Sequence, residues 1–165
     1  MALSGLTDDP RLDRTTALTP DNAVAAIITI GDRYLLQLRD RKHGIFFPDH
    51  WGCFGGGVEP DEALEQALIR ELNEELSLEL NAEQVRYFTR FEFDLGFARL
   101  APIWRVFYEV SLEPATVPTL TLGEGSDMRL FGAEEILTCK ITVTPYDAFA
   151  LWFHINRNRL IGAHR

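Results

Sequence analysis

Cysteine is scarce in this sequence, and positive charge is outweighed by negative charge. The chain has 165 residues and 2 cysteines, Cys53 and Cys139, which do not stand in a metal-ligand spacing. Lys and Arg total 16 against 25 Asp and Glu, so the formal net charge is −9. Such a chain repels the phosphate backbone of nucleic acid, and we expect no nucleic-acid duplex among its partners.

Long hydrophobic runs are missing as well. The longest apolar run is a few residues within AVAAIITI, far short of the roughly 20 residues that span a bilayer. The N-terminus also lacks a basic region followed by an apolar run, which is the pattern of a secretory signal. We therefore expect a cytoplasmic protein that makes no contact with a membrane.

The chain does contain enough apolar material for one folded domain. Hydrophobic residues make up 46% of the sequence, and the length is about that of one domain. Residues 1–21 are polar and show no clear period. We expect an N-terminal arm over 1–21 and a single domain over 22–165.

Apolar, β-branched and aromatic residues mark the expected strands and helices. Residues 22–30 and 33–39 flank the turn signal Gly31-Asp32, which predicts a hairpin. Two alternating, aromatic segments, 85–95 and 97–110, predict a second strand pair that turns near Gly96. Shorter strands are expected at 51–56 and 128–133, and helices are expected over 62–76 and 144–160.

The helix predicted over 62–76 is unusually acidic. Its carboxylates are those of Glu62, Glu65, Glu71, Glu74 and Glu75, and its single basic residue is Arg70. Glu71 and Glu75 stand four residues apart, so they share one helix face, where like charges repel. A leucine at every fourth position from 64 to 76 forms an apolar stripe with Glu75 at its margin. Carboxylates so placed either form a solvated acidic face or bind a divalent cation such as Mg²⁺.

The residues around this helix resemble the Nudix box, G-x5-E-x7-R-E-U-x-E-E-x-G-U, in which U is aliphatic. The match runs from Gly56 to Leu78, and every specified position agrees except one. The exception is Ser77, which stands where the family has Gly. A left-handed turn at the helix end favours Gly, so Ser77 is expected either to cost about 1 kcal/mol or to shift the helix end.

The resemblance implies an α/β (α+β) protein with the Nudix fold, a mixed β-sheet sandwiched between helices. It also implies a pyrophosphohydrolase that depends on Mg²⁺ or Mn²⁺. The substrate of such an enzyme is a nucleoside diphosphate linked to another moiety X, and the products are a nucleoside monophosphate and phosphorylated X. Nucleotide sugars, ADP-ribose, modified nucleoside triphosphates and dinucleoside polyphosphates all fit, and the sequence does not choose among them.

The box implies which residues hold the metal. Its ligands would be Glu71, Glu74 and Glu75, together with the backbone carbonyl of Gly55. These oxygens suit a hard cation that neutralises the pyrophosphate and helps to orient the attacking water. Arg70 precedes Glu71 and is expected to orient the glutamates through a charge-assisted hydrogen bond.

The general base is open between two residues. Many Nudix enzymes use a glutamate from a loop that faces the box, and Glu124 in the segment LGEGSD is placed for this role. Glu71 is the competing choice.

Other residues are candidates for substrate binding. Gly56 and Gly57 allow the main chain to approach the phosphates without a side chain in the way. Arg39 belongs to a basic cluster that suits phosphate, although a solvated loop is an equal alternative. Phe47 and Trp104 are candidates for stacking on a base, but aromatics at such positions more often belong to the core.

Two classes of function stay open. The first is an enzyme that turns over a small-molecule nucleotide substrate, and the second is a nucleotide-binding or regulatory domain without turnover. The second class usually loses box glutamates, whereas Glu71, Glu74 and Glu75 are intact. The sequence does not decide whether the chain forms a homodimer.

Overall fold

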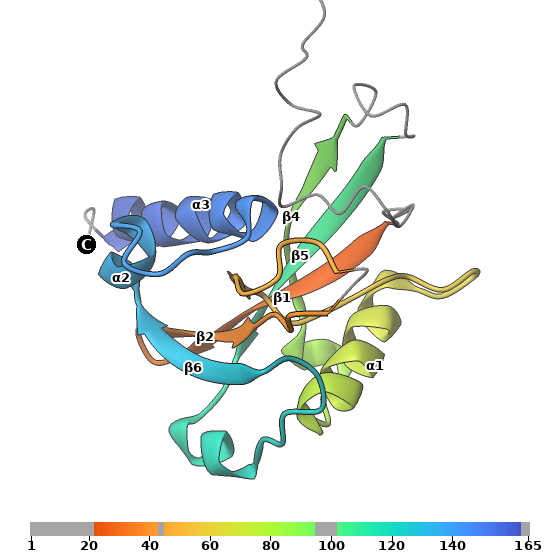
Figure 1. Ribbon diagram of the computed structural model, residues 1–165. Helices are drawn as coiled ribbons and strands as arrows, with labels where there is room; N and C mark the ends of the chain where they lie inside the picture. Colours follow the sequence, from red (N-terminus) through yellow and green to blue (C-terminus); the bar gives the residue numbers. More distant parts are fainter. Residues whose placement is uncertain (1–21, 43–44, 95–101, 163–165) are drawn as a thin grey trace, which may run out of the picture.

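A computed structural model describes residues 22–42, 45–94 and 102–162 (Figure 1). The arm expected over 1–21 and the turn expected near Gly96 lie outside these residues. The strands are β1 (Ala23–Ile30), β2 (Arg33–Leu38), β3 (Trp51–Gly52), β4 (Arg86–Phe93), β5 (Ile103–Ser111) and β6 (Asp127–Gly132). The helices are α1 (Leu64–Leu76), α2 (Ala133–Leu137) and α3 (Pro145–Gly162), and two short 3-10 helices span Ala82–Gln84 and Pro114–Thr119.

The strands form one mixed sheet. Their order is β3-β2-β1-β5-β4, and β6 lies off this path and pairs with β2. Along β2, residues 33–35 pair with β1, residues 37–38 pair with β3, and the whole strand pairs with β6. The predicted β1–β2 hairpin and the predicted β4–β5 pair are both antiparallel. β1 and β5 run parallel, with Ala23 opposite Arg105 and Thr29 opposite Ser111. A parallel pair needs a long connection, and here that connection contains the acidic helix α1.

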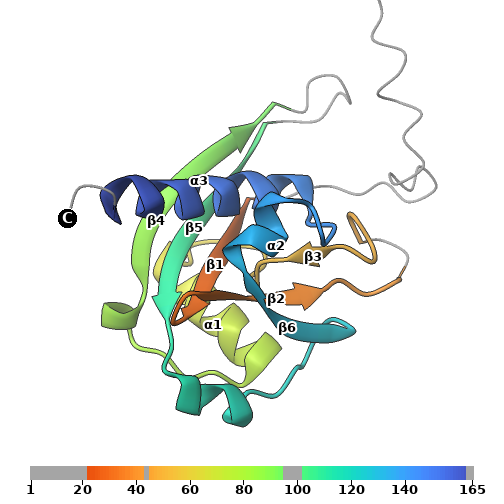
Figure 2. The same ribbon diagram turned by 90° about the vertical axis from the view of Figure 1, so that its left-hand side faces the viewer.

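β1 runs through the middle of the sheet and is buried on both faces. Val24, Ala26 and Ile28 belong to the apolar cluster that includes α1, whereas Ala25 and Ile27 belong to the cluster that includes α3. Figures 1 and 2 show α1 on one face of the sheet and α2 with α3 on the other. This is the sandwich of a mixed sheet between helices that the sequence predicted.

Helix α1 begins two residues later than predicted. Asp61 has a φ of 61°, which is incompatible with an α-helix, and Ala63 is the N-cap. Glu62 lies before the helix, where its carboxylate accepts the N–H of Glu59 and a hydrogen bond from Arg70. The leucine stripe is buried as expected, with Leu68, Leu72 and Leu76 at 0% exposure.

Ser77 ends α1 in a left-handed conformation, with φ 52° and ψ 33°. Its N–H donates to the carbonyl of Asn73 at 2.8 Å, and the N–H of Leu78 donates to the carbonyl of Leu72 at 3.3 Å. Bonds of this kind satisfy the last carbonyls of a helix. Ser77 therefore accepts the conformation that favours Gly, and the helix end does not move.

Helix α3 closes the second face of the sheet close to the predicted bounds. Its buried residues include Ala150, Leu151 and Ile155, and its outer side exposes Phe149 and Trp152. None of the helices in the described ranges combines the length and apolar character needed to cross a bilayer.

Candidate active site

The glycine turn after β3 lies against the start of β1. The N–H of Val24 donates to the carbonyl of Gly56, and the N–H of Ala26 donates to the carbonyl of Phe54, both at 2.9 Å. Gly55 has a φ of 126°, and a Cβ there would sit 2.9 Å from the Cα of Ala25. Only glycine fits a backbone in this conformation and this close to a neighbouring strand. β1 therefore fixes the position of the turn.

Glu75 ties α1 to this turn. Its side chain is buried, at 5% exposure, and its carboxylate accepts the N–H of Gly55 at 2.7 Å and the amide of Gln37 at 3.1 Å. Burial raises the pKa of Glu75 to about 7, the two hydrogen bonds oppose the rise, and the charges of Glu71 and Glu124 add to it. A carboxylate in this state is expensive to ionise without a nearby cation.

Glu71 lies against the same turn. A Cβ at Gly56 would sit 2.6 Å from the Cδ of Glu71, closer than real Cβ atoms approach other groups. The absent side chain at Gly56 is therefore the space that the Glu71 carboxylate occupies. Burial raises the pKa of Glu71, a hydrogen bond from Arg70 lowers it, and Glu74 and Glu124 raise it further.

Arg70 neutralises the start of the box. Its guanidinium binds both carboxylate oxygens of Glu62, each at 2.9 Å, and its Nη1 donates to Glu71 at 2.8 Å. Nη1 also lies 3.5 Å from the carboxylate of Glu74, and Nη2 donates to the carbonyl of Gly57 at 3.1 Å. One arginine thus contacts three carboxylates and the glycine turn, and its geometry suits the orienting role expected from the sequence.

The loop that carries Glu124 lies across the end of α1. The N–H of Gly123 donates to the carbonyl of Glu75 at 2.7 Å, and the N–H of Thr121 donates to the carbonyl of Leu76 at 3.0 Å. Glu124 itself is exposed, and its charge raises the pKa of Glu71 and of Glu75. The structure therefore brings the loop glutamate into electrostatic range of the box glutamates.

The predicted metal ligands do not form a finished coordination shell. In the part of the chain that the structure describes, no three acidic, histidine or cysteine side chains gather closely enough to hold a metal. Glu71 is engaged by Arg70, Glu75 is engaged by Gly55 and Gln37, and the Glu74 side chain is 60% exposed.

The chemistry of these donors nevertheless fits a hard divalent cation. All of them are oxygens, and the glutamates raise one another's pKa across a small region at the turn. A cation bound by Glu71 and Glu75 would relieve this repulsion.

The predicted substrate-binding residues separate into two groups. Arg39 and Phe47 lie on the α3 side of the turn: Arg39 donates from Nε to the carbonyl of Phe46 at 2.8 Å, and the ring of Phe47 lies 5.7 Å from that of Tyr146. Trp104 is half-buried and packs against the apolar cluster beneath α1. Its placement matches the core alternative noted from the sequence.

Sequence reasoning missed an ion pair next to this group. Arg105 of β5 donates from Nε to Asp147 of α3 at 3.1 Å, and Asp147 is completely buried. Burial works to lower the pKa of Arg105, but the charge of Asp147, with smaller effects from groups that include Glu75, raises it. No short motif links the two residues, and only the packing of α3 on β5 brings them together.

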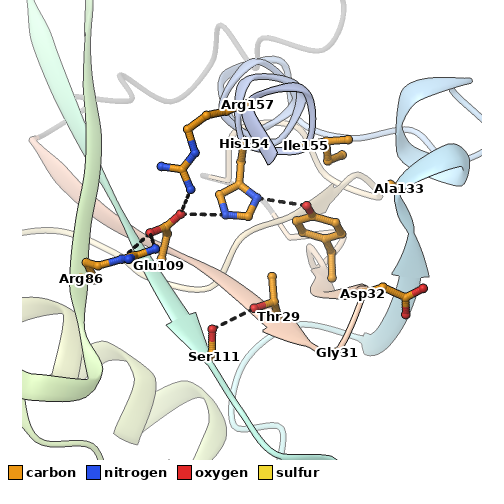
Figure 3. Close-up of a pocket in the computed structure, with 11 residues that line it drawn as sticks. Thr29, Gly31, Asp32, Arg86, Glu109, Ser111, Ala133, His154, Ile155 and Arg157 are labelled. Carbon is orange, nitrogen blue, oxygen red and sulfur yellow. Dashed lines mark hydrogen bonds and ion pairs between the residues drawn. The ribbon is translucent and has the colours of Figure 1, made fainter. Parts of the chain in front are cut away.

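A separate cavity of about 410 Å³ lies under the far half of α3 (Figure 3). Glu109 of β5 accepts hydrogen bonds there from Arg86 and Arg157 and lies 3.0 Å from Nε2 of His154, whose Nδ1 is 3.0 Å from the hydroxyl of Tyr34. Burial lowers the pKa of His154, and Glu109 opposes this shift. None of the residues predicted for the site lines this cavity.

Comparisons with known proteins agree with the geometry. The family model of the NUDIX domain matches residues 19–153. The nucleoside triphosphatase NudI of Enterobacter sp. (strain 638) is 41% identical over 63 residues, which are 38% of this chain and 44% of the relative. The chain thus spans less than half of that relative's length.

Solved structures share the fold. The solution structure of the E. coli ORF135 protein is 28% identical, with a TM-score of 0.63 over 86% of this chain and 93% of that one. A bifunctional NMN adenylyltransferase/ADP ribose pyrophosphatase from Francisella tularensis, in complex with AMP and a Mn ion, is 21% identical, with a TM-score of 0.59 over 88% of this chain and 43% of that one. With the box residues gathered at the glycine turn and the family model covering most of the sequence, the chain belongs to the Nudix hydrolase family.

Proposed function

We propose that this protein is a divalent-metal-dependent pyrophosphohydrolase that acts on nucleoside triphosphates. The reaction would consume one water, break one P–O–P bond and give a nucleoside monophosphate and pyrophosphate. In the broader form expected from the sequence, phosphorylated X takes the place of pyrophosphate. Mg²⁺ or Mn²⁺ would serve as the metal.

The observation that supports this proposal best is the state of Glu75. The Glu75 carboxylate is 5% exposed, has a pKa of about 7 and lies at the glycine turn together with Glu71. A fold that needed only stability would be served by an uncharged residue at this position. The repulsion between the Glu75 and Glu71 carboxylates favours the binding of a cation, because the cation neutralises both charges.

The metal would be held by Glu71, Glu74, Glu75 and the carbonyl of Gly55. When bound, it would supply positive charge to the pyrophosphate and lower the pKa of the attacking water. The role of the protein's own residues is to hold these ligand oxygens in place. Arg70 fixes the Glu71 carboxylate, and the N–H of Gly55 fixes that of Glu75.

Glu124 is our choice of general base, with Glu71 as the alternative. Glu124 is exposed on a loop that is fastened to the end of α1, so its carboxylate is free to meet a water at the turn. Glu71 already accepts a hydrogen bond from Arg70 at 2.8 Å and is a proposed metal ligand, so its carboxylate is less available to a water.

The substrate class rests on the relatives. A relative with 41% identity over the matched segment is named a nucleoside triphosphatase, and a structural neighbour was solved with AMP and a Mn ion. In this proposal, Arg39, on the α3 side of the turn, contacts a phosphate, and Phe47 contacts a ring. The substrate is a small molecule, so no nucleic-acid duplex and no membrane is needed.

One assay tests the proposal. The purified chain is incubated with the four common nucleoside triphosphates, a nucleotide sugar and ADP-ribose, with Mg²⁺ or with EDTA, and the products are identified by chromatography. We expect monophosphate and pyrophosphate from at least one triphosphate, and none in EDTA. Tight nucleotide binding without any product would favour the non-catalytic domain instead.

A further inference from the structure

The buried pair of Arg105 and Asp147 presents hydrogen-bond donors to a ligand but no acceptors. One carboxylate oxygen of Asp147 accepts from Nε of Arg105 at 3.1 Å. The other accepts from the N–H of Cys53 at 3.0 Å and from the hydroxyl of Thr144 at 2.9 Å. Both carboxylate oxygens of Asp147 therefore accept hydrogen bonds from the protein, and Asp147 holds the guanidinium of Arg105 in place.

The two Nη groups of Arg105 are left for a ligand. Among the described residues, neither Nη has a hydrogen-bonding or ionic partner. No buried side-chain nitrogen in those ranges lacks a partner, so both Nη groups reach solvent although the side chain is only 12% exposed. A guanidinium held at Nε offers two further donors in one fixed plane, which is the geometry of bidentate recognition.

These donors lie next to the proposed catalytic turn. Asp147 accepts the N–H of Cys53, and Glu75 accepts the N–H of Gly55, two residues further along the same segment. Two residues of extended chain span about 7 Å. Glu75 is also near enough for its charge to act on Arg105. A nucleotide whose phosphates meet the turn would therefore place its nucleoside part near Arg105.

The surroundings of Arg105 suit a base better than a phosphate. Its guanidinium carbon lies 5.0 Å from the ring centre of Tyr146 and 5.7 Å from that of Phe107, and Phe91 packs on Phe107 at 5.9 Å. The charge of Asp147 cancels that of Arg105. A neutral pair among aromatic rings attracts a flat, uncharged ring with acceptor atoms, whereas a phosphate requires unbalanced positive charge.

We propose that Arg105 determines base specificity by donating from both Nη groups to two adjacent acceptors of the base, an inference that rests on the proposed function. Guanine offers such a pair in O6 and N7, and cytosine offers one in N3 and O2. Adenine places the N6 donor beside N7, and uracil and thymine place the N3 donor between their carbonyls. The site therefore favours guanine or cytosine nucleotides over adenine, uracil or thymine nucleotides.

The test is equilibrium binding of GMP, CMP, AMP and UMP by titration calorimetry, in EDTA so that no turnover is needed. We expect the wild type to bind GMP or CMP roughly tenfold or more tightly than AMP and UMP, as for a bidentate contact. Arg105→Lys keeps a cation for Asp147 but loses the planar fork, so this preference should disappear. The control is Arg90→Gln, an exposed arginine of β4, which should leave the preference unchanged.

Thermal melts establish that the variants are folded. If Arg105→Lys does not fold, Arg105→Met combined with Asp147→Asn removes both charges and keeps an acceptor for the N–H of Cys53. Equal binding of the four nucleotides by the wild type, or an equal loss for all four in the variant, would overturn the proposal. If the base preference is found but no nucleotide is hydrolysed, the proposed activity fails and the role of Arg105 stands.

Discussion

The carboxylate of Glu75 accepts the N–H of Gly55 at 2.7 Å, and this bond joins the acidic helix to the glycine turn. Glu75 is thereby held at 5% exposure beside Glu71, with a pKa that burial raises to about 7. Glu75 and Gly55 stand 20 positions apart in the sequence. The energetic consequence of their hydrogen bond is a metal-free protein that carries an unfavourable charge.

The first prediction concerns Glu75→Gln in chelator. Between pH 4.5 and about 7, the unfolded chain loses the Glu75 proton while the folded chain keeps it, so this residue lowers the stability of the wild type as the pH rises. Full ionisation should cost about 3 kcal/mol. The free energy of unfolding of the variant should match that of the wild type at pH 4.5 and exceed it at pH 8.5, as measured by urea denaturation in EDTA.

Millimolar Mg²⁺ provides the contrasting condition. A ligand that binds only the folded form stabilises it in proportion to the logarithm of its concentration over the dissociation constant. The wild type should gain stability in Mg²⁺, and Glu75→Gln should lose most of this gain. A variant that is strongly destabilised in EDTA at every pH would show instead that Glu75 serves as a structural hydrogen-bond acceptor.

Gly56→Ala should reduce kcat with little effect on folding. The new Cβ would sit 2.6 Å from the Cδ of Glu71 and would push this carboxylate away from the turn. Displacing a catalytic group by about 1 Å can cost roughly 100-fold in rate. Gly132→Ala is the control, because a Cβ at Gly132, at the end of β6, would meet its nearest atom at an ordinary contact distance of 3.5 Å. Steady-state kinetics of the two variants should differ sharply, and equal activities would argue against the placement of Glu71.

Glu124→Gln tests the choice of base. The amide cannot accept the proton of the attacking water, so kcat should fall by roughly 100-fold or more. The dissociation constant for Mg²⁺, measured by calorimetry, should change far less than the rate. A loss of rate below about threefold would assign the role of base to Glu71.

Ser77→Gly should stabilise the protein. Ser77 holds a left-handed conformation at the end of α1, and glycine adopts this conformation without the steric cost. Part of the gain, of up to about 1 kcal/mol, is offset by the greater freedom of glycine in the unfolded chain. Thermal melts should show a small rise in Tm at unchanged kcat. A lowered Tm would mean that the serine side chain contributes a contact of its own.

Local patterns in the sequence were sufficient for most of the fold. The β1–β2 hairpin followed from two apolar runs around Gly31-Asp32, and the buried stripe of α1 followed from leucines at every fourth position. The start of α1 was placed too early, because the sequence does not reveal that Asp61 adopts a positive φ and that Glu62 is drawn to Arg70. The short helix α2 was missed, since five residues carry too little periodicity.

The neighbourhood of residues that are close in the chain was predictable. The spacing of the box predicted that Arg70, Glu71 and Glu75 lie near one another, because they share one helix. Arg105 and Asp147 could not be paired in advance, since they come from a strand and a helix that meet only in the folded protein. Trp104 was a candidate for stacking on a base, but an aromatic residue in a strand can face either side of the sheet. In the structure it packs against the cluster beneath α1.

The most direct measurement is the rate of pyrophosphate release from nucleoside triphosphates as a function of Mg²⁺ concentration, for the wild type and for Glu75→Gln. If the glutamates at the glycine turn bind a catalytic metal, the wild-type rate should be zero in EDTA and should rise to saturation with millimolar Mg²⁺. The rate of the variant should be lower by at least about 100-fold at every concentration. Release that proceeds equally in EDTA, or that survives the substitution unchanged, would contradict a metal-dependent site at Glu75.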